Sequence, residues 1–382
     1  MSADLYERLA RHLDDLPGGF PRTESGVELR LLRRLFTPEQ AEMALHLTPI
    51  PEEARVVARR ARLPVEEAAR RLEEMERKRI IAGEHDGPAP RYQVMQCVIG
   101  FWEGQVDRLD PELVRDFEEY LPSLFDPESW RKAPQLRTIP IGVSISPRIE
   151  AMPYERAEAI VGTQDTFAVA NCICRQELHV MGEGCDRPLE TCLAFGKIAD
   201  HVVRAGRGRF ITRDEVLQIL RKANETGLVL QPSNAKDALF MCACCGCCCG
   251  VLRSVKRYPK PASLMSSAFI AALDAETCEG CGTCESRCQM AAIHMDDGRA
   301  VLELDRCIGC GLCVTTCSTE SLSLARKPAA EQPQVPKDLI DSYIRLAQAR
   351  GRLGTRELIG MQVRSKWDRL AASRVSGFTF RV

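Results

Sequence analysis

The sequence of 382 residues lacks several features that would point to common classes of protein. Its 52 lysines and arginines almost balance 53 aspartates and glutamates, so a net charge of −1 predicts neither a nucleic-acid nor a membrane partner for the chain as a whole. Apolar runs stay shorter than the ~18 residues that a membrane-spanning helix needs. The first residues lack the apolar core of a secretory signal peptide, so we expect no export.

The familiar signatures of enzymes are also missing. The six histidines are scattered, and the sequence contains no phosphate-binding loop and no flavin or nicotinamide fingerprint. An enzyme built on this chain would need metal clusters alone, or a partner that carries the organic cofactor.

Cysteine is what the chain has in excess. There are 19 cysteines, and all except Cys97 fall between Cys172 and Cys317. The odd number and the close spacing argue against a disulfide framework and favour metal binding in a reducing cytoplasm. We expect an anaerobe, because oxygen attacks exposed iron–sulfur clusters. Cys97 lies in an apolar stretch and is predicted to be an ordinary core residue.

Eight cysteines form two copies of one pattern, in which gaps of two, two and three residues separate four cysteines. This spacing is typical of iron–sulfur ligands, with the fourth cysteine of each run binding the other run's cluster. The first [4Fe–4S] cluster is therefore expected on Cys278, Cys281, Cys284 and Cys317. The second is expected on Cys307, Cys310, Cys313 and Cys288. Four glycines should permit the tight loops, namely Gly280, Gly282, Gly309 and Gly311.

With these runs, residues 274–326 resemble the bacterial dicluster ferredoxins. The resemblance implies two [4Fe–4S] clusters and electron transfer. Between the runs, Asp296-Asp297-Gly298 predicts a β-hairpin. The sequence departs from the family after the fourth cysteine of each run, where Gln289 and Ser318 replace the usual proline. Zinc is the alternative metal for four-thiolate sites, but it does not need interleaved triplets.

A second group contains four cysteines within 21 residues, enough for a third cluster or for structural zinc. It follows an expected strand at 167–170, and a helix is expected to start at Cys192 and run to about 203. The group consists of Cys172, Cys174, Cys185 and Cys192.

A third group places six cysteines in eight positions, more than one cubane can use. Adjacent cysteines must point in different directions, so we expect some to bind a fourth cluster locally and others to complete a cluster with the 172–192 group. Some could instead be buried apolar residues, or the group could hold an open-coordination cluster where catalysis occurs. Its members are Cys242, Cys244, Cys245, Cys247, Cys248 and Cys249.

The N-terminal part is expected to form a separate domain. Helices at 37–47, 51–61 and 65–78, followed by strands at 80–84 and 91–95, predict a winged helix-turn-helix. The expected recognition helix, 65–78, carries four bases and five acids, a net charge of −1, which disfavours DNA binding. A scaffold for protein contacts is preferred.

The chain is thus interpreted as α+β and multi-domain. The predicted segments are a winged-helix-like domain (1–130), an extended linker (131–152), a cysteine-rich iron–sulfur domain (153–273), a dicluster ferredoxin domain (274–326) and a basic helical C-terminal extension (327–382). Residues 326–382 hold twelve bases and five acids, a net charge of +7. This extension could pack on the chain's own acidic surface, dock a redox partner or contact anionic lipid.

We therefore predict a multi-cluster iron–sulfur protein that relays single electrons between redox partners, as a carrier or as the electron-transfer subunit of an oxidoreductase. One alternative is a redox-sensing DNA-binding regulator. The other is a reductase subunit with catalysis at a cluster in the 242–249 loop.

Overall fold

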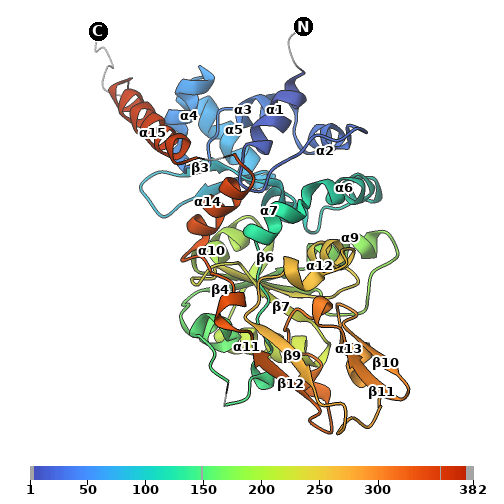
Figure 1. Ribbon diagram of the computed structural model, residues 1–382. Coiled ribbons are helices and arrows are strands. Elements are labelled where there is room, and N and C mark those ends of the chain that lie inside the picture. Colours follow the sequence, from blue (N-terminus) through green and yellow to red (C-terminus); the bar gives the residue numbers. More distant parts are fainter. Residues whose placement is uncertain (1–3, 148, 353, 376–382) are drawn as a thin grey trace, which may run out of the picture. The chain divides into compact units, whose positions relative to one another are not determined.

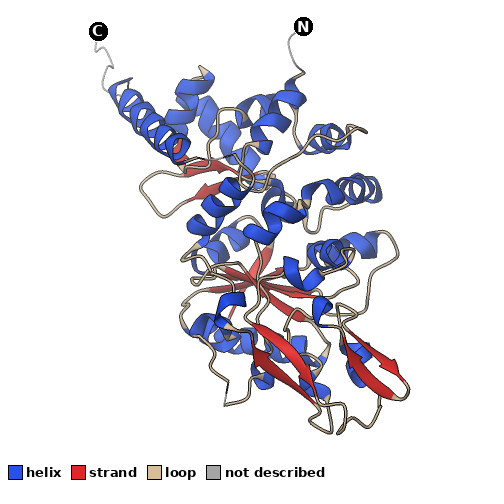
Figure 2. Cartoon of the chain, viewed as in Figure 1, coloured by secondary structure: helices blue, strands red, loops and turns tan. Residues whose placement is uncertain are grey.

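The computed structural model describes residues 4–147, 149–352 and 354–375, which form two compact units (Figure 1). Both ends of the chain build one unit, Met1–Leu124 with Ala347–Val382, and Phe125–Leu346 builds the other. Helices hold 46% and strands 16% of the residues, and the strands form antiparallel sheets separate from the helices, so the α+β class is confirmed (Figure 2). The five predicted segments remain a prediction.

Residues 4–124 of the N-terminal unit contain six α-helices and a three-stranded sheet. The helices are α1 (Leu5–Asp14), α2 (Val27–Leu35), α3 (Pro38–Ala44), α4 (Ala54–Ala61), α5 (Val65–Arg77) and α6 (Pro111–Leu124). The strands are β1 (Glu52–Glu53), β2 (Ile81–Glu84) and β3 (Arg91–Val94), in the order β1-β3-β2. Thr37 starts α3 as expected, and it forms a capping box with Gln40. The second expected helix begins late, at Ala54, because Glu52 and Glu53 pair with β3.

The C-terminal extension is helical: α14 (Leu339–Ala349) spans the boundary between the units at Leu346, and α15 (Thr355–Val375) belongs to the unit that contains the N-terminal helices. Helix α15 packs against α4, where its Asp368 pairs with Arg59 and Arg60 at 2.9 and 2.7 Å. At this contact the tail supplies the acid and the N-terminal domain supplies the bases. One of the alternatives for the extension was the reverse, a basic tail packed on an acidic surface of the chain. Arg350 does meet an acid, Asp14, at 2.8 Å.

The other unit is built around a five-stranded antiparallel sheet in the order β6-β4-β5-β8-β7. Its strands are β4 (Phe167–Asn171), β5 (Glu190–Phe195), β6 (Gly208–Ile211), β7 (Val229–Pro232) and β8 (Phe240–Cys244). The helices are α7 (Pro127–Lys132), α8 (Ala157–Gly162), α9 (Ile173–Val180), α10 (Gly196–Arg204), α11 (Arg213–Glu225) and α12 (Gly250–Lys256). The expected capping box of Thr212 and Glu215 starts α11. Bridges from Leu136 and Ile139 attach the extended linker to residues 230–233 along β7.

One prediction in this unit is wrong. Cys192 does not start a helix; it lies inside β5, and α10 begins at Gly196. The strand forms because β4 and β8 pair with it on both sides, which satisfies its backbone hydrogen bonds. Its apolar residues Leu193 and Phe195 are buried at 1% and 0% exposure.

The dicluster segment has its own framework. Strand β9 (Phe269–Leu273) pairs with β12 (Leu322–Arg326), and β10 (Ile293–Asp296) forms a hairpin with β11 (Arg299–Leu302). Helix α13 (Thr283–Arg287) is short. The hairpin is the expected one, and both turn residues, Asp297 and Gly298, have positive φ, as a two-residue turn of this kind requires.

Candidate metal centres

The eight cysteines of the repeated pattern line two cavities. In each cavity, three thiols come from one run and the fourth from the other. Cys278, Cys281, Cys284 and Cys317 line the first. Cys307, Cys310, Cys313 and Cys288 line the second. All four loop glycines take the positive φ that the tight turns need, between 68° and 75°.

The two cavities differ in their exposure to solvent. At the first, Cys281 is exposed, and its contact with Thr283 lowers the pKa of its thiol. At the second, burial raises the pKa of Cys313 to about 12 and raises that of Cys310 further above the ordinary range. Thiols with a raised pKa need a metal to become thiolates. The first cavity thus has one thiol at the surface, whereas the thiols of the second are buried or half-buried.

Backbone amides donate hydrogen bonds to two thiols of the second cavity. The N–H of Ala271 donates to Sγ of Cys307 at 3.3 Å, and the N–H of Ala292 donates to Sγ of Cys288 at 3.1 Å. Such bonds stabilise negative charge on sulfur and help to set the reduction potential of a bound iron–sulfur cluster.

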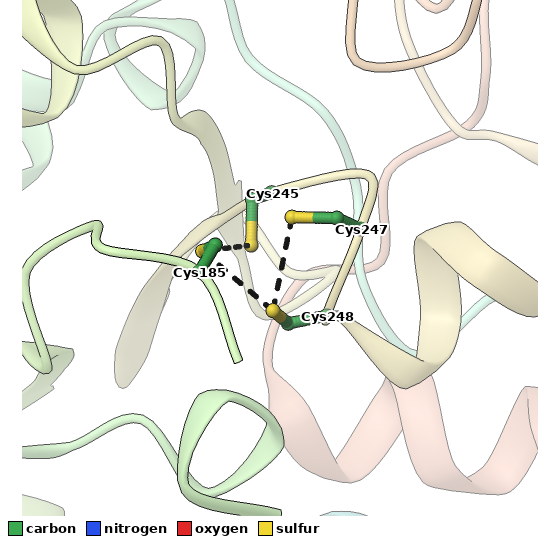
Figure 3. Close-up of side chains that lie close together, drawn as sticks. All are labelled: Cys185, Cys245, Cys247 and Cys248. Atoms are coloured by element: carbon green, nitrogen blue, oxygen red, sulfur yellow. Dashed lines mark hydrogen bonds between the residues drawn. The ribbon is translucent and has the colours of Figure 1, made fainter. Parts of the chain in front are cut away.

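A separate group of four thiols lies in the middle of the sequence (Figure 3). The sulfurs of Cys185, Cys245, Cys247 and Cys248 all lie within 4.8 Å of one another. Cys185 comes from the loop between α9 and β5, and the other three come from the loop between β8 and α12. In the described part of the chain, no other set of three or more potential metal ligands has its ligand atoms this close together.

Two arginines donate hydrogen bonds to this group. Arg187 Nη1 lies 3.6 Å from Sγ of Cys247, and Arg175 Nη1 lies 3.6 Å from Sγ of Cys245. Burial alone would raise the pKa of Cys185, but bonds from the backbone and side chain of Arg187 reverse the effect and lower it to about 6. Burial raises the pKa of Cys247 and of Cys248, so these two thiols would ionise on binding a metal, whereas Arg187 favours the thiolate of Cys185.

The other six middle cysteines gather on one face of the five-stranded sheet. Cys192 on β5 pairs with Cys242 on β8, so their side chains share a face, and Cys244 follows on the same side two residues later. Cys172 ends the loop into α9, and Cys249 precedes α12. The face thus collects Cys172, Cys174, Cys192, Cys242, Cys244 and Cys249.

Contacts between thiols connect these six residues. Cys174 contacts both Cys172 and Cys249, and Cys249 also contacts Cys244. Cys242 contacts Cys244 and Cys192. Thiol contacts and burial raise the pKa of Cys172 and of Cys242 well above the ordinary value, so these sulfurs would ionise on binding a metal.

A buried arginine lies between the two middle groups. Arg175 has 0% exposure and donates to Cys245 of one group and to the carbonyl of Ala243 at 3.1 Å. Burial would lower its pKa, but the neighbouring sulfurs of Cys172, Cys245 and Cys244 raise it overall. A guanidinium in this position can compensate negative charge in both groups.

The structure groups the middle cysteines differently from the two sets predicted from the sequence. Cys185 was expected with Cys172, Cys174 and Cys192, but the sulfur contacts shown for it are with Cys245 and Cys248. Cys192 pairs with Cys242 on the neighbouring strand, and the alternation of side chains along β8 places Cys244 on the same face. Cys192 therefore lies with the cysteines of β8 and not in the group of Cys185. We expected the cysteines of the 242–249 loop to point in different directions, and in the structure they divide between the two groups. Cys97 is buried at 1% exposure among the residues of the N-terminal unit.

Comparisons with known proteins locate one domain. No curated protein and no solved structure matches the chain. In the described residues, no helix combines the length and apolar character needed to cross a bilayer. Residues 277–322 match the family model of the 4Fe-4S dicluster domain, so the cofactors of this chain are [4Fe–4S] clusters and this segment is an iron–sulfur domain of the ferredoxin type.

Proposed function

We propose that this protein relays single electrons between redox partners through its dicluster domain. The observation that carries the proposal is the pair of cavities, each lined by three cysteines of one run and one of the other. Cys278, Cys281, Cys284 and Cys317 would hold one [4Fe–4S] cluster, and Cys307, Cys310, Cys313 and Cys288 the other. Such clusters accept and release one electron at a time.

The difference in exposure supports a path for electrons through the domain. The exposed Cys281 would place one cluster where a partner protein can approach. Around the other cavity, Ile308 and Leu312 are buried in the same apolar core as strands β5, β7 and β8, and Cys288 and Cys310 pack against it. Electrons would enter or leave at the surface cluster and exchange with the cysteine-rich sheet through the inner one.

The six-cysteine face is the proposed continuation of this path. Its members come from strands β5 and β8 and from the ends of loops at α9 and α12, and they contact one another in the interior. Six thiols exceed the four that a cubane needs, so this face could hold one further iron–sulfur cluster with two spare cysteines. The reductase alternative places catalysis at a cluster in the 242–249 loop, which contributes Cys242, Cys244 and Cys249 to this face.

The regulator alternative has less support. It rests on the winged helix expected from the order of helices and strands, but four arginines of α4 and α5 pair with acids of the same unit. On α5, Arg70 and Arg71 both pair with Glu67, and on α4, Arg59 and Arg60 pair with Asp368. DNA would have to displace these acids. A role in protein contacts fits this surface better.

The test of electron relay uses protein purified without oxygen. The clusters are reduced, excess reductant is removed by desalting, and the protein is mixed with oxidised cytochrome c. We expect at least two electrons to be delivered per chain. Cys281→Ser should lower the yield by removing the surface cluster, whereas Cys97→Ser should leave it unchanged. Protein with its full iron content that delivers no electrons would contradict the proposal.

A further inference from the structure

The four thiols at Cys185 and the 245–248 loop differ in spacing from those of the dicluster domain. The sulfurs of Cys185 and Cys245 are 3.8 Å apart, those of Cys185 and Cys248 are 3.6 Å apart, and those of Cys247 and Cys248 are 3.7 Å apart. Figure 3 shows the four side chains converging on one point between the two loops. In the described part of the chain, no three of the eight dicluster thiols lie within 4.8 Å of one another.

These spacings match a single tetrahedral ion. With zinc–sulfur bonds of about 2.3 Å, the sulfurs at the corners of the tetrahedron stand about 3.8 Å apart. A four-iron cube binds each thiolate to a different iron, so its four sulfurs must stand further apart around a larger space. The two dicluster cavities provide that space.

We propose that Cys185, Cys245, Cys247 and Cys248 bind one tetrahedral zinc ion, separate from the iron–sulfur clusters. Four thiolates and no open position are typical of structural zinc sites. This set contains Cys185 from the first middle group and three cysteines from the second, a combination that spacing along the sequence did not single out.

The surroundings balance the charge of such a site. Four thiolates and one divalent ion leave two negative charges. The guanidinium groups of Arg175 and Arg187, each 3.6 Å from a ligand sulfur, supply two positive charges. Donors of this kind orient thiolate ligands and strengthen metal binding.

The position of the site indicates what the ion would do. It would join two loops separated by about 60 residues in the sequence, fixing Gly246 between the ligands Cys245 and Cys247. Gly246 lies directly against Gln289, the residue after Cys288 of the inner cavity. The zinc ion would thus hold the 245–248 loop in the position that supports the inner cluster of the dicluster domain.

The first test measures the wild-type full-length protein, purified anaerobically. We expect one zinc per chain, and X-ray absorption at the zinc edge should show four sulfur neighbours at about 2.3 Å. Less than a third of an equivalent of zinc, or zinc with nitrogen and oxygen neighbours, would overturn the proposal. Because no variant is needed, misfolding cannot obscure this result.

The second test separates the two kinds of site by substitution. Cys185→Ser should remove the zinc and leave the iron and acid-labile sulfide of the surface cluster in place. Cys281→Ser should do the opposite, and Cys97→Ser should change neither. If Cys185→Ser lowers iron and sulfide by about four each and leaves the zinc content at the wild-type value, the site holds a cubane and the zinc assignment is wrong.

Discussion

The side-chain oxygen of Gln289 accepts a hydrogen bond from the backbone N–H of Gly246 at 2.8 Å. Gln289 is 7% exposed and occupies the position where dicluster ferredoxins usually have proline. A proline has no side-chain acceptor and could not bind the amide. The departure from the family pattern therefore has a structural role: it attaches the cysteine-rich loop next to Cys288.

The first prediction concerns the close approach of these two residues. A Cβ added to Gly246 would lie 2.0 Å from the carbonyl oxygen of Gln289, a backbone atom that cannot move alone. Gly246→Ala should lower the free energy of unfolding by about 1–3 kcal/mol. Denaturant unfolding and iron content measure the effect.

Gly162→Ala is the matched control, because a Cβ at this position in α8 would have no neighbour within 4 Å. Its free energy of unfolding should stay within about 0.5 kcal/mol of the wild-type value, or rise. Equal losses in the two variants would show that contact with Gln289 is not the cause.

The second prediction tests the crossed ligands. If Cys317 serves the surface cluster and Cys288 the inner one, Cys317→Ser should produce the same EPR spectrum of the reduced protein as Cys281→Ser. Likewise, Cys288→Ser should match Cys310→Ser. Each variant should lose about four irons. Spectra that pair Cys317→Ser with Cys310→Ser would instead show that each run binds its own cluster.

How much the sequence predicts depends on whether the ligands are close in the chain. The dicluster residues follow from local spacing, because tight glycine turns bring each triplet of cysteines together. The middle site does not, since Cys185 meets Cys245 and Cys248 only after the sheet has brought distant loops together. Cys192 pairs with Cys242 because it lies in strand β5, although the local sequence predicts a helix that starts at Cys192.

The same reasoning applies to the tail. Helix α14 lies in the extension that the sequence predicts to be helical, and its Leu339, Tyr343 and Leu346 have the spacing of one helix face. Helix α15 lacks a comparable signal: Ile359, Val363 and Trp367 are exposed at 56%, 49% and 69%, and its contact with α4 depends on polar pairs. Such pairs between residues some 300 positions apart leave no periodic pattern in the sequence.

The third prediction concerns the buried charge of Arg175. Arg175→Gln would leave the sulfur of Cys245 and the carbonyl of Ala243 without their cationic donor in the interior. Losing one partner of a buried charged contact costs about 3–5 kcal/mol, so the variant should unfold at clearly lower denaturant concentration. Arg187→Gln, at an exposed contact with Cys247, should cost less than about 1.5 kcal/mol. Equal effects of the two substitutions would contradict this account.

The fourth prediction is a dependence of stability on pH in the N-terminal unit. Burial lowers the pKa of His12, whose Nε2 lies 3.0 Å from the carbonyl oxygen of Leu47. The unfolded chain then binds the proton more tightly than the folded one. The contribution of His12 to stability is present above its unfolded pKa of about 6.5 and is lost as the pH falls through the lowered folded value.

Hydrogen exchange of the amides in α1 and α3 measures this effect locally. Exchange protection in wild-type protein should fall between pH 7.5 and pH 5.5, after correction for the intrinsic rate. His12→Gln should reduce the difference, whereas substitution of the exposed His294 on β10 should not. A wild-type protection that rises on acidification would show that the sign is wrong.

The last prediction concerns how α15 is held. Asp368 pairs with Arg59 and Arg60, and Ser365 donates to the buried Glu52 at 2.6 Å. Asp368→Asn removes the charge that both arginines share, so α15 should detach more often and trypsin should cut faster at Arg364 and nearby bases. Because these pairs are partly exposed, we expect a cost of about 1 kcal/mol, corresponding to roughly a fivefold faster cleavage. Glu357→Gln, a matched loss of one acid whose side chain contacts the N–H of Gly354 within the same segment, should leave the cleavage rate near the wild-type value. Faster cleavage in both variants would mean that net charge, and not the contact with α4, holds the helix.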